Sequence, residues 1–239
     1  MTAPQNHLKL VSANKNQIST TAFFIDLVIY IAVMFAVREL YFPKIGFMAN
    51  GLCWSITTLV VAAWRMNARG VTWKELGLCK PGNTKKALIA TVFIPVMGIV
   101  SIVIFQIVKD QLQLGLERDT SDESAVSKFG NLKGNWILFF SILPVIWIQS
   151  FLEELLDRGF LMNWIERMFS GTLVATILAV ILQAVIFGFR HSYDLSERSI
   201  TVGLIGLAMG VGYVAFGRNL WPLIIAHCLL NTISMFDRV

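Results

Sequence analysis

The chain has 239 residues, of which 56% are hydrophobic and only 15% are charged, and this balance excludes an ordinary soluble domain. Its hydrophobic residues are gathered in blocks of about 20, the length that an α-helix needs to cross a bilayer. The net charge of +5 would suit a nucleic-acid binder. However, the basic residues stand mostly between the hydrophobic blocks, where lipid headgroups are the nearest anions, so we do not expect nucleic-acid binding.

In chain order, the blocks predict an all-α fold, a polytopic transmembrane helical bundle of about seven spans, with six to eight possible. A polar N-terminal tail at residues 1–20 precedes them. Residues 21–134 are expected to form accessory spans and loops, and residues 135–239 a catalytic transmembrane core. The predicted spans are 21–37, 46–64, 87–108, 136–168, 172–190, 200–216 and 220–236.

The connection between the second and third spans, residues 65–86, is the most basic segment of the chain. By the positive-inside rule it should lie in the cytoplasm, which would place the N-terminus there too. The short chain and its few extramembrane residues favour a bacterial plasma membrane. The segment carries one acid, Glu75, against Arg65, Arg69, Lys74, Lys80, Lys85 and Lys86.

The fourth span contains four ionisable residues within six positions, Glu153, Glu154, Asp157 and Arg158. An ionisable residue at the bilayer centre costs about 2.5–3.5 kcal/mol, so such residues usually face a partner or a wet cavity. Glu154 and Arg158 are four residues apart and can pair on one helical face. Glu153 then points about 100° away around the helix and is free to act as a general base.

Two histidines lie in or at the end of later spans. His191 ends the fifth span, whereas His227 lies in the seventh span, four residues before Asn231 and therefore on the same helical face. Together with the acidic pair, they predict one shared polar site. Because His191 and Glu153 lie on oppositely directed spans, they can meet only if these spans are unequal, kinked or tilted.

These residues form three motifs in a recognisable order. Their arrangement resembles the E-E-x-x-x-R, F-x-x-x-H and H-x-x-x-N motifs of the CAAX prenyl protease and bacteriocin-processing family of intramembrane endopeptidases. The resemblance covers roughly residues 136–236. The matching stretches are 153–158 (EELLDR), 187–191 (FGFRH) and 227–231 (HCLLN).

The resemblance implies hydrolysis of a peptide bond in a membrane-associated peptide or protein. Glu153 would activate a water molecule with help from His191, while His227 and Asn231 would stabilise the oxyanion. Structural support of the site is implied for Glu154, Arg158 and Phe187. A metal-free glutamate mechanism is favoured, because the H-E-x-x-H arrangement of zinc proteases is absent; if zinc is present, Glu153, His191 and His227 are its expected ligands.

Two other functions remain open from the sequence. A non-catalytic membrane partner, such as a bacteriocin self-immunity or sensor-kinase-binding protein, could use the same fold, although the intact motif set favours an enzyme. A small transporter could use Asp26, Glu153 and the histidines as a proton path. The chain lacks the paired interrupted spans that are typical of transporters.

Overall fold

The computed structural model describes residues 19–116, 126 and 128–239, so most of the predicted N-terminal tail lies outside the described residues. Within these residues the fold is entirely helical, which confirms the predicted class. Six helices are long and apolar enough to cross a membrane, and a seventh, of 17 residues, is shorter. The elements are α2 (Thr20–Ala36), η2 (Val37–Glu39), η3 (Pro43–Ile45), α3 (Gly46–Ala68), α4 (Thr84–Gln111), α6 (Trp136–Glu154), η4 (Leu155–Leu161), α7 (Met162–Met168), α8 (Leu173–Ser192), α9 (Glu197–Ala215) and α10 (Leu220–Phe236).

Polar side chains fix the start of most of these helices. In each case an oxygen of the residue before the helix accepts a hydrogen bond from a backbone N–H of the first turn, which would otherwise lack a partner in an apolar environment. The helix starts therefore fall close to the predicted ones. The capping residues are Ser19 for α2, Asn83 for α4, Asn135 for α6, Thr172 for α8 and Asn219 for α10.

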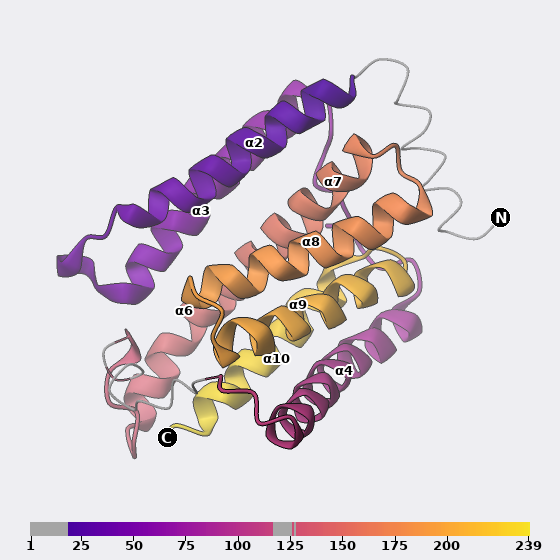
Figure 1. The fold of residues 1–239 in the computed structure, drawn as a ribbon. Coiled ribbons are helices and arrows are strands. Elements are labelled where there is room, and N and C mark those ends of the chain that lie inside the picture. The colour runs from indigo at the N-terminus through magenta and orange to yellow at the C-terminus, as the bar shows by residue number, and fades with distance from the viewer. Residues whose placement is uncertain (1–18, 117–125, 127) are drawn as a thin grey trace.

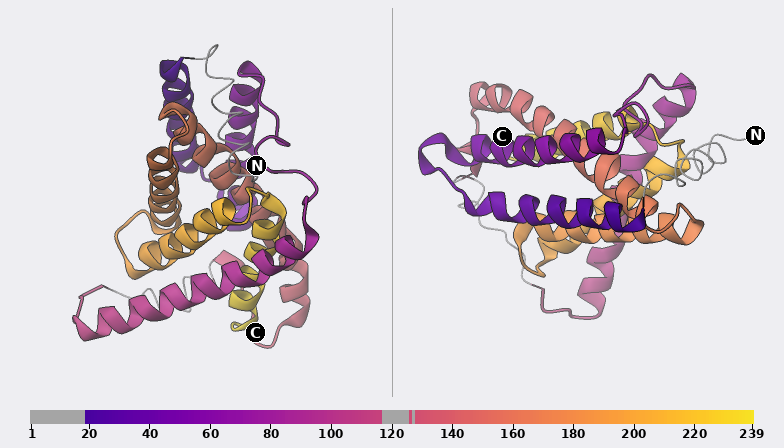
Figure 2. Two further views of the ribbon diagram at one scale, coloured as in Figure 1. Left: turned by 90° about the vertical axis from the view of Figure 1, so that its right-hand side faces the viewer. Right: turned by 90° about the horizontal axis from the view of Figure 1, so that it is seen from above.

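Two helix pairs, α2 with α3 and α8 with α9, pack against the fourth span (α6, η4 and α7), as Figures 1 and 2 show. Helices α2 and α3 pack side by side as a hairpin that contacts α7 and the first part of the fourth span. Helices α8 and α9 form a second, closely packed pair, and α4 packs against α9 and α10 on the far side. The outer surface is apolar, with exposed Leu88, Val92 and Ile137 among many others, as expected for contact with lipid.

Glycines let α8 and α9 approach closely. A Cβ atom built on Gly188 of α8 would collide with the backbone of Ser199 and Gly203 of α9. About two turns farther along α9, a Cβ on Gly210 would lie 2.7 Å from the Gln183 amide nitrogen. Small residues thus replace side-chain packing by backbone contact between these two helices.

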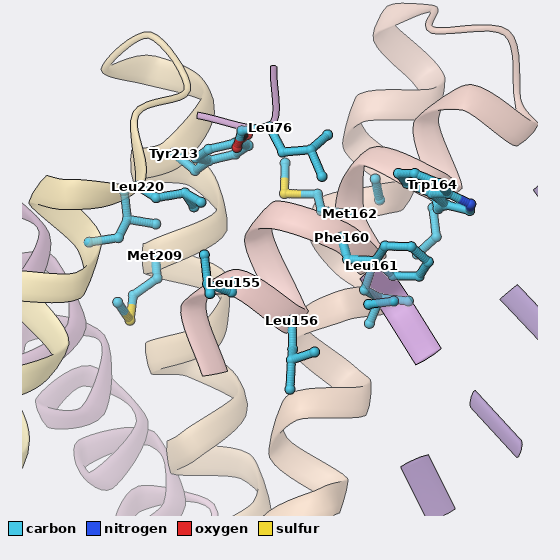
Figure 3. Close-up of a cluster of buried hydrophobic side chains, with 14 of the residues drawn as sticks. Leu76, Leu155, Leu156, Phe160, Leu161, Met162, Trp164, Met209, Tyr213 and Leu220 are labelled. Carbon is cyan, nitrogen blue, oxygen red and sulfur yellow. Dashed lines mark hydrogen bonds between the residues drawn. The ribbon is translucent and has the colours of Figure 1, made fainter. Parts of the chain in front are cut away.

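The hydrophobic core surrounds a π-helical turn in the middle of the fourth span. All seven residues of η4 are buried, and Figure 3 shows Leu155 of this turn beside Met209, and Phe160 on the opposite side beside Trp164. A π turn disrupts the regular i→i−4 ladder, so its carbonyl groups need other donors. Asn163 donates to the carbonyls of Arg158 and Gly159, and the Tyr30 hydroxyl donates to the Leu156 carbonyl. This turn immediately follows Glu153 and Glu154.

Candidate active site

A cavity of about 700 Å³ collects the polar residues that the sequence singled out. Its lining includes Glu153 from α6, His191 from α8, and His227 and Asn231 from α10. Apolar residues of α3, α4 and α9 form much of the remaining wall. The three motifs therefore converge on one cavity.

Glu153 and Glu154 contact opposite nitrogens of the same imidazole ring. His227 Nδ1 lies 2.8 Å from Glu154 Oε1, and His227 Nε2 lies 3.6 Å from Glu153 Oε2. Arg158 Nη1 donates to the same Glu154 oxygen at 2.8 Å, as the i,i+4 spacing predicts. Glu154 and Arg158 are both fully buried. The pair thus anchors His227 beside Glu153.

Hydrogen-bond chemistry fixes which nitrogen of each histidine carries a proton. His191 Nδ1 lies 2.6 Å from the carbonyl oxygen of Phe187, and His227 Nδ1 faces a carboxylate. Both oxygens accept only, so both Nδ1 atoms must donate, which leaves Nε2 of a neutral ring as an acceptor. His191 and Glu153 line the same cavity.

Phe187 packs between the charged groups of the site. Its ring centroid lies 4.5 Å from the His191 ring and 6.1 Å from the His227 ring. The Arg158 guanidinium carbon lies 4.5 Å from the Phe187 ring centroid, in cation–π contact. Phe187 therefore holds both histidines and Arg158 in place.

Asn231 lines the cavity one helical turn after His227. Its side-chain nitrogen donates to the hydroxyl of Ser150 on α6 at 2.9 Å. This bond uses one of the two amide hydrogens. The second hydrogen remains for another acceptor in the cavity.

Three polar contacts of the site were not predicted. Gln149 donates to Glu153 Oε1 at 2.8 Å and to Ser55 of α3, and Arg190 binds the buried Asp157 at 2.7 Å. The contact between Gln149 and Glu153 could have been predicted, because the two polar residues are four positions apart in a hydrophobic span. The Asp157–Arg190 pair joins the π turn to the last turn of α8, directly before His191.

The meeting of Glu153 and His191 follows from their distance to the turn that joins their helices. Glu153 lies about 15 residues before the end of α7 at Met168, and His191 lies about 18 residues after the start of α8 at Leu173. In two antiparallel helices these positions are nearly level. The fourth span, unbroken over 33 residues, supplies the unequal length that the sequence required.

Asp26 belongs to a separate cluster and does not line the cavity. Its buried carboxylate binds Arg65 at 2.7 Å and Arg69 at 2.8 Å, and it accepts a hydrogen bond from Trp164. This cluster ties α2, α3 and α7 together. It offers no support for a proton path from Asp26 to Glu153.

The fold and the cavity define a polytopic membrane protein with a buried glutamate and histidine site. Residues 135–233 match the family model described as type II CAAX prenyl endopeptidase Rce1-like, so this part of the chain is similar to the CAAX prenyl proteases. Comparisons with curated proteins and with solved structures gave no match. The family supports a CAAX-type intramembrane endopeptidase in general, with a membrane-associated substrate.

Proposed function

We propose that the chain hydrolyses a peptide bond of a membrane-associated peptide or protein, with Glu153 as the general base. The observation that carries this proposal is the convergence of Glu153, His191, His227 and Asn231 on one cavity. A cavity inside a helical bundle can hold water and exclude bulk solvent, and a carboxylate beside two imidazoles can accept a proton from that water.

In this mechanism the attacking water molecule binds both Glu153 and His191 Nε2. Glu153 takes a proton from the water as the water oxygen attacks the scissile carbonyl carbon. The carbonyl oxygen becomes an oxyanion and accepts hydrogen bonds from the free Asn231 amide hydrogen and from His227. The tetrahedral intermediate then collapses, the C–N bond breaks, and the proton passes to the leaving amine.

The charges around His227 suit a role as an oxyanion donor. Three carboxylates, Glu153, Glu154 and Asp157, surround two guanidinium groups, those of Arg158 and Arg190. Glu154 and Glu153 carry negative charge on opposite sides of the His227 ring, so both attract a cationic imidazole. A proton on Nε2 gives this ring a second hydrogen-bond donor.

The proposal uses the metal-free mechanism, because the sequence lacks the H-E-x-x-H arrangement of zinc proteases. Within the described residues, no three side chains of the His, Cys, Asp or Glu type converge as a metal-binding group. If zinc binds nonetheless, Glu153, His191 and His227 are its expected ligands, and it would polarise the bound water.

Cleavage assays in proteoliposomes would test the proposal, with a library of lipidated and unlipidated peptides read out by mass spectrometry. We expect the wild-type chain to cleave and Glu153→Gln to be inactive but folded, because the amide keeps the shape of the side chain yet cannot take a proton. Strong chelators should leave the wild-type rate unchanged. A Glu153→Gln protein that cleaves at the wild-type rate would overturn the proposal, and loss of the wild-type activity with chelators would replace the metal-free mechanism by a zinc mechanism.

A further inference from the structure

Gln149 connects the catalytic carboxylate to a helix outside the family match. Its Nε2 atom lies 2.8 Å from Glu153 Oε1 and 2.8 Å from the hydroxyl oxygen of Ser55. Gln149 stands on α6 one turn before Glu153, whereas Ser55 is a buried residue of α3. The contact between Gln149 and Ser55 spans 94 positions of sequence.

The chemistry of these groups fixes the orientation of the amide. The Glu153 carboxylate only accepts hydrogen bonds, so Gln149 must present its NH₂ group to it. One hydrogen of that group serves Glu153 and the other serves Ser55. Two partners on two helices therefore hold the amide.

This arrangement makes the two oxygens of Glu153 inequivalent. Oε1 is held by Gln149, while Oε2 lies 3.6 Å from His227 Nε2. The last torsion of a glutamate side chain has a broad energy profile, so rotamer preference alone does not hold the carboxylate plane. The Gln149 bond supplies that restraint and leaves Oε2 on the His227 side to take the proton from water.

We propose that Gln149 is a positioning residue for Glu153 and that Ser55 acts through Gln149. This inference rests on the proposed function, in which Glu153 is the base. It also gives the accessory helix α3 a defined part in catalysis, although α3 lies outside the matched residues 135–233. If Gln149 and Ser55 only satisfied each other's hydrogen bonds within the apolar spans, their replacement would change the stability of the protein and not the rate of the reaction.

The test compares kcat, KM and thermal unfolding of Gln149→Leu, Ser55→Ala and the double variant, in the proteoliposome assay. Gln149→Leu should lower kcat about 10- to 100-fold with little change in KM, the usual range when a group that orients a reacting side chain is lost. Ser55→Ala should lower kcat less. The double variant should match Gln149→Leu alone, because Ser55 acts through Gln149.

Two further variants serve as controls. Ser55→Thr keeps the hydroxyl and should restore most of the rate. Ser101→Ala removes a hydroxyl that bonds only within its own helix α4, to the Met97 carbonyl, and should leave kcat unchanged.

Wild-type kcat in a folded Gln149→Leu protein, additive losses in the double variant, or a loss that follows the unfolding temperature alone would each overturn the positioning role. If Gln149→Leu does not fold, the kcat of Ser55→Ala and Ser55→Thr decides. An inactive Glu153→Gln beside a fully active Gln149→Leu overturns only this inference, whereas a fully active Glu153→Gln overturns the proposed function as well.

Discussion

Glu154 holds two basic side chains with a single carboxylate oxygen. Arg158 Nη1 and His227 Nδ1 each lie 2.8 Å from Oε1, and no part of Glu154 is exposed. Arg158 also donates to the Gly206 carbonyl of α9. The charge pair therefore links α6, α9 and α10, and it directs His227 Nε2 toward Glu153.

Replacement of Arg158 by alanine should lower folding yield and activity together. The variant leaves Glu154 as an uncompensated buried charge, and breaking a buried pair in this way typically costs about 3–5 kcal/mol. Thermal unfolding in detergent and the cleavage rate would measure the two effects. Arg158→Lys, which keeps the charge but lacks the forked guanidinium, should be intermediate. A stable and fully active Arg158→Ala protein would contradict the role of this pair.

Asn231→Ala should retain slow turnover, whereas His191→Ala should be inactive. Loss of one oxyanion donor typically lowers kcat about 100- to 1000-fold while the nucleophile stays intact. Rates from single-turnover cleavage would rank the two variants, and Ser141→Ala, which removes an exposed hydroxyl bonded to the Ile137 carbonyl of its own helix, would be the control. Faster turnover by His191→Ala than by Asn231→Ala would reverse the roles that we assign.

The sequence predicted the residues that bear the motifs, and the structure places Glu153, His191, His227 and Asn231 around one cavity. It did not predict the contacts made by Gln149 and Ser55. Motif residues are recognisable by type and spacing along one helix, but the Gln149–Ser55 bond depends on how α3 packs against α6. Such tertiary contacts between common polar residues leave no local pattern.

At the scale of elements, the π turn η4 distinguishes the fourth span from a regular helix. Asn163 is almost fully buried, and its side-chain nitrogen lies within hydrogen-bond distance of Arg158 O, Gly159 O and the Tyr213 hydroxyl. These bonds satisfy carbonyls that the wider turn leaves without their usual partners. The helix ends of the bundle were largely predicted from the hydrophobic blocks of the sequence. The π turn was not, because no residue of LLDRGFL forbids an ordinary α-helix.

Asn163→Ala should destabilise the protein by about 1–3 kcal/mol, since it leaves buried carbonyls without a donor. Because the same turn carries Arg158, the cleavage rate should fall as well. Chemical unfolding in detergent gives the free energy. Thr91→Ala, which removes a hydroxyl bonded only within α4, is the matched control. Equal stability of Asn163→Ala and the control would show that the turn does not need these bonds.

At the scale of the whole molecule, the structure changes which basic residues of the 65–86 connection support its predicted cytoplasmic location. Arg65 and Arg69 bind Asp26, so four lysines and Glu75 remain as the other charges of the 65–86 connection. The lysines still give this end of the bundle a positive excess. The expectation that it faces the cytoplasm therefore stands on Lys74, Lys80, Lys85 and Lys86.

Single cysteines on either side of α3 would test this orientation. Lys44 and Lys80 are both exposed and lie beyond opposite ends of that helix. In a background without Cys53, Cys79 and Cys228, an impermeant maleimide should label Lys44→Cys on intact cells, and Lys80→Cys only after permeabilisation. The reverse pattern would place the N-terminus outside.

The Asp26 cluster has a consequence for how the chain enters the membrane during synthesis. A lone aspartate in the first span is costly for insertion. Its two arginine partners follow only 39 and 43 residues later, on the next helix. The charge can therefore be neutralised within the first helical hairpin as it leaves the ribosome, long before Trp164 is made. The two N-terminal helices can therefore insert with the aspartate already paired, before the helices that complete the cavity are made.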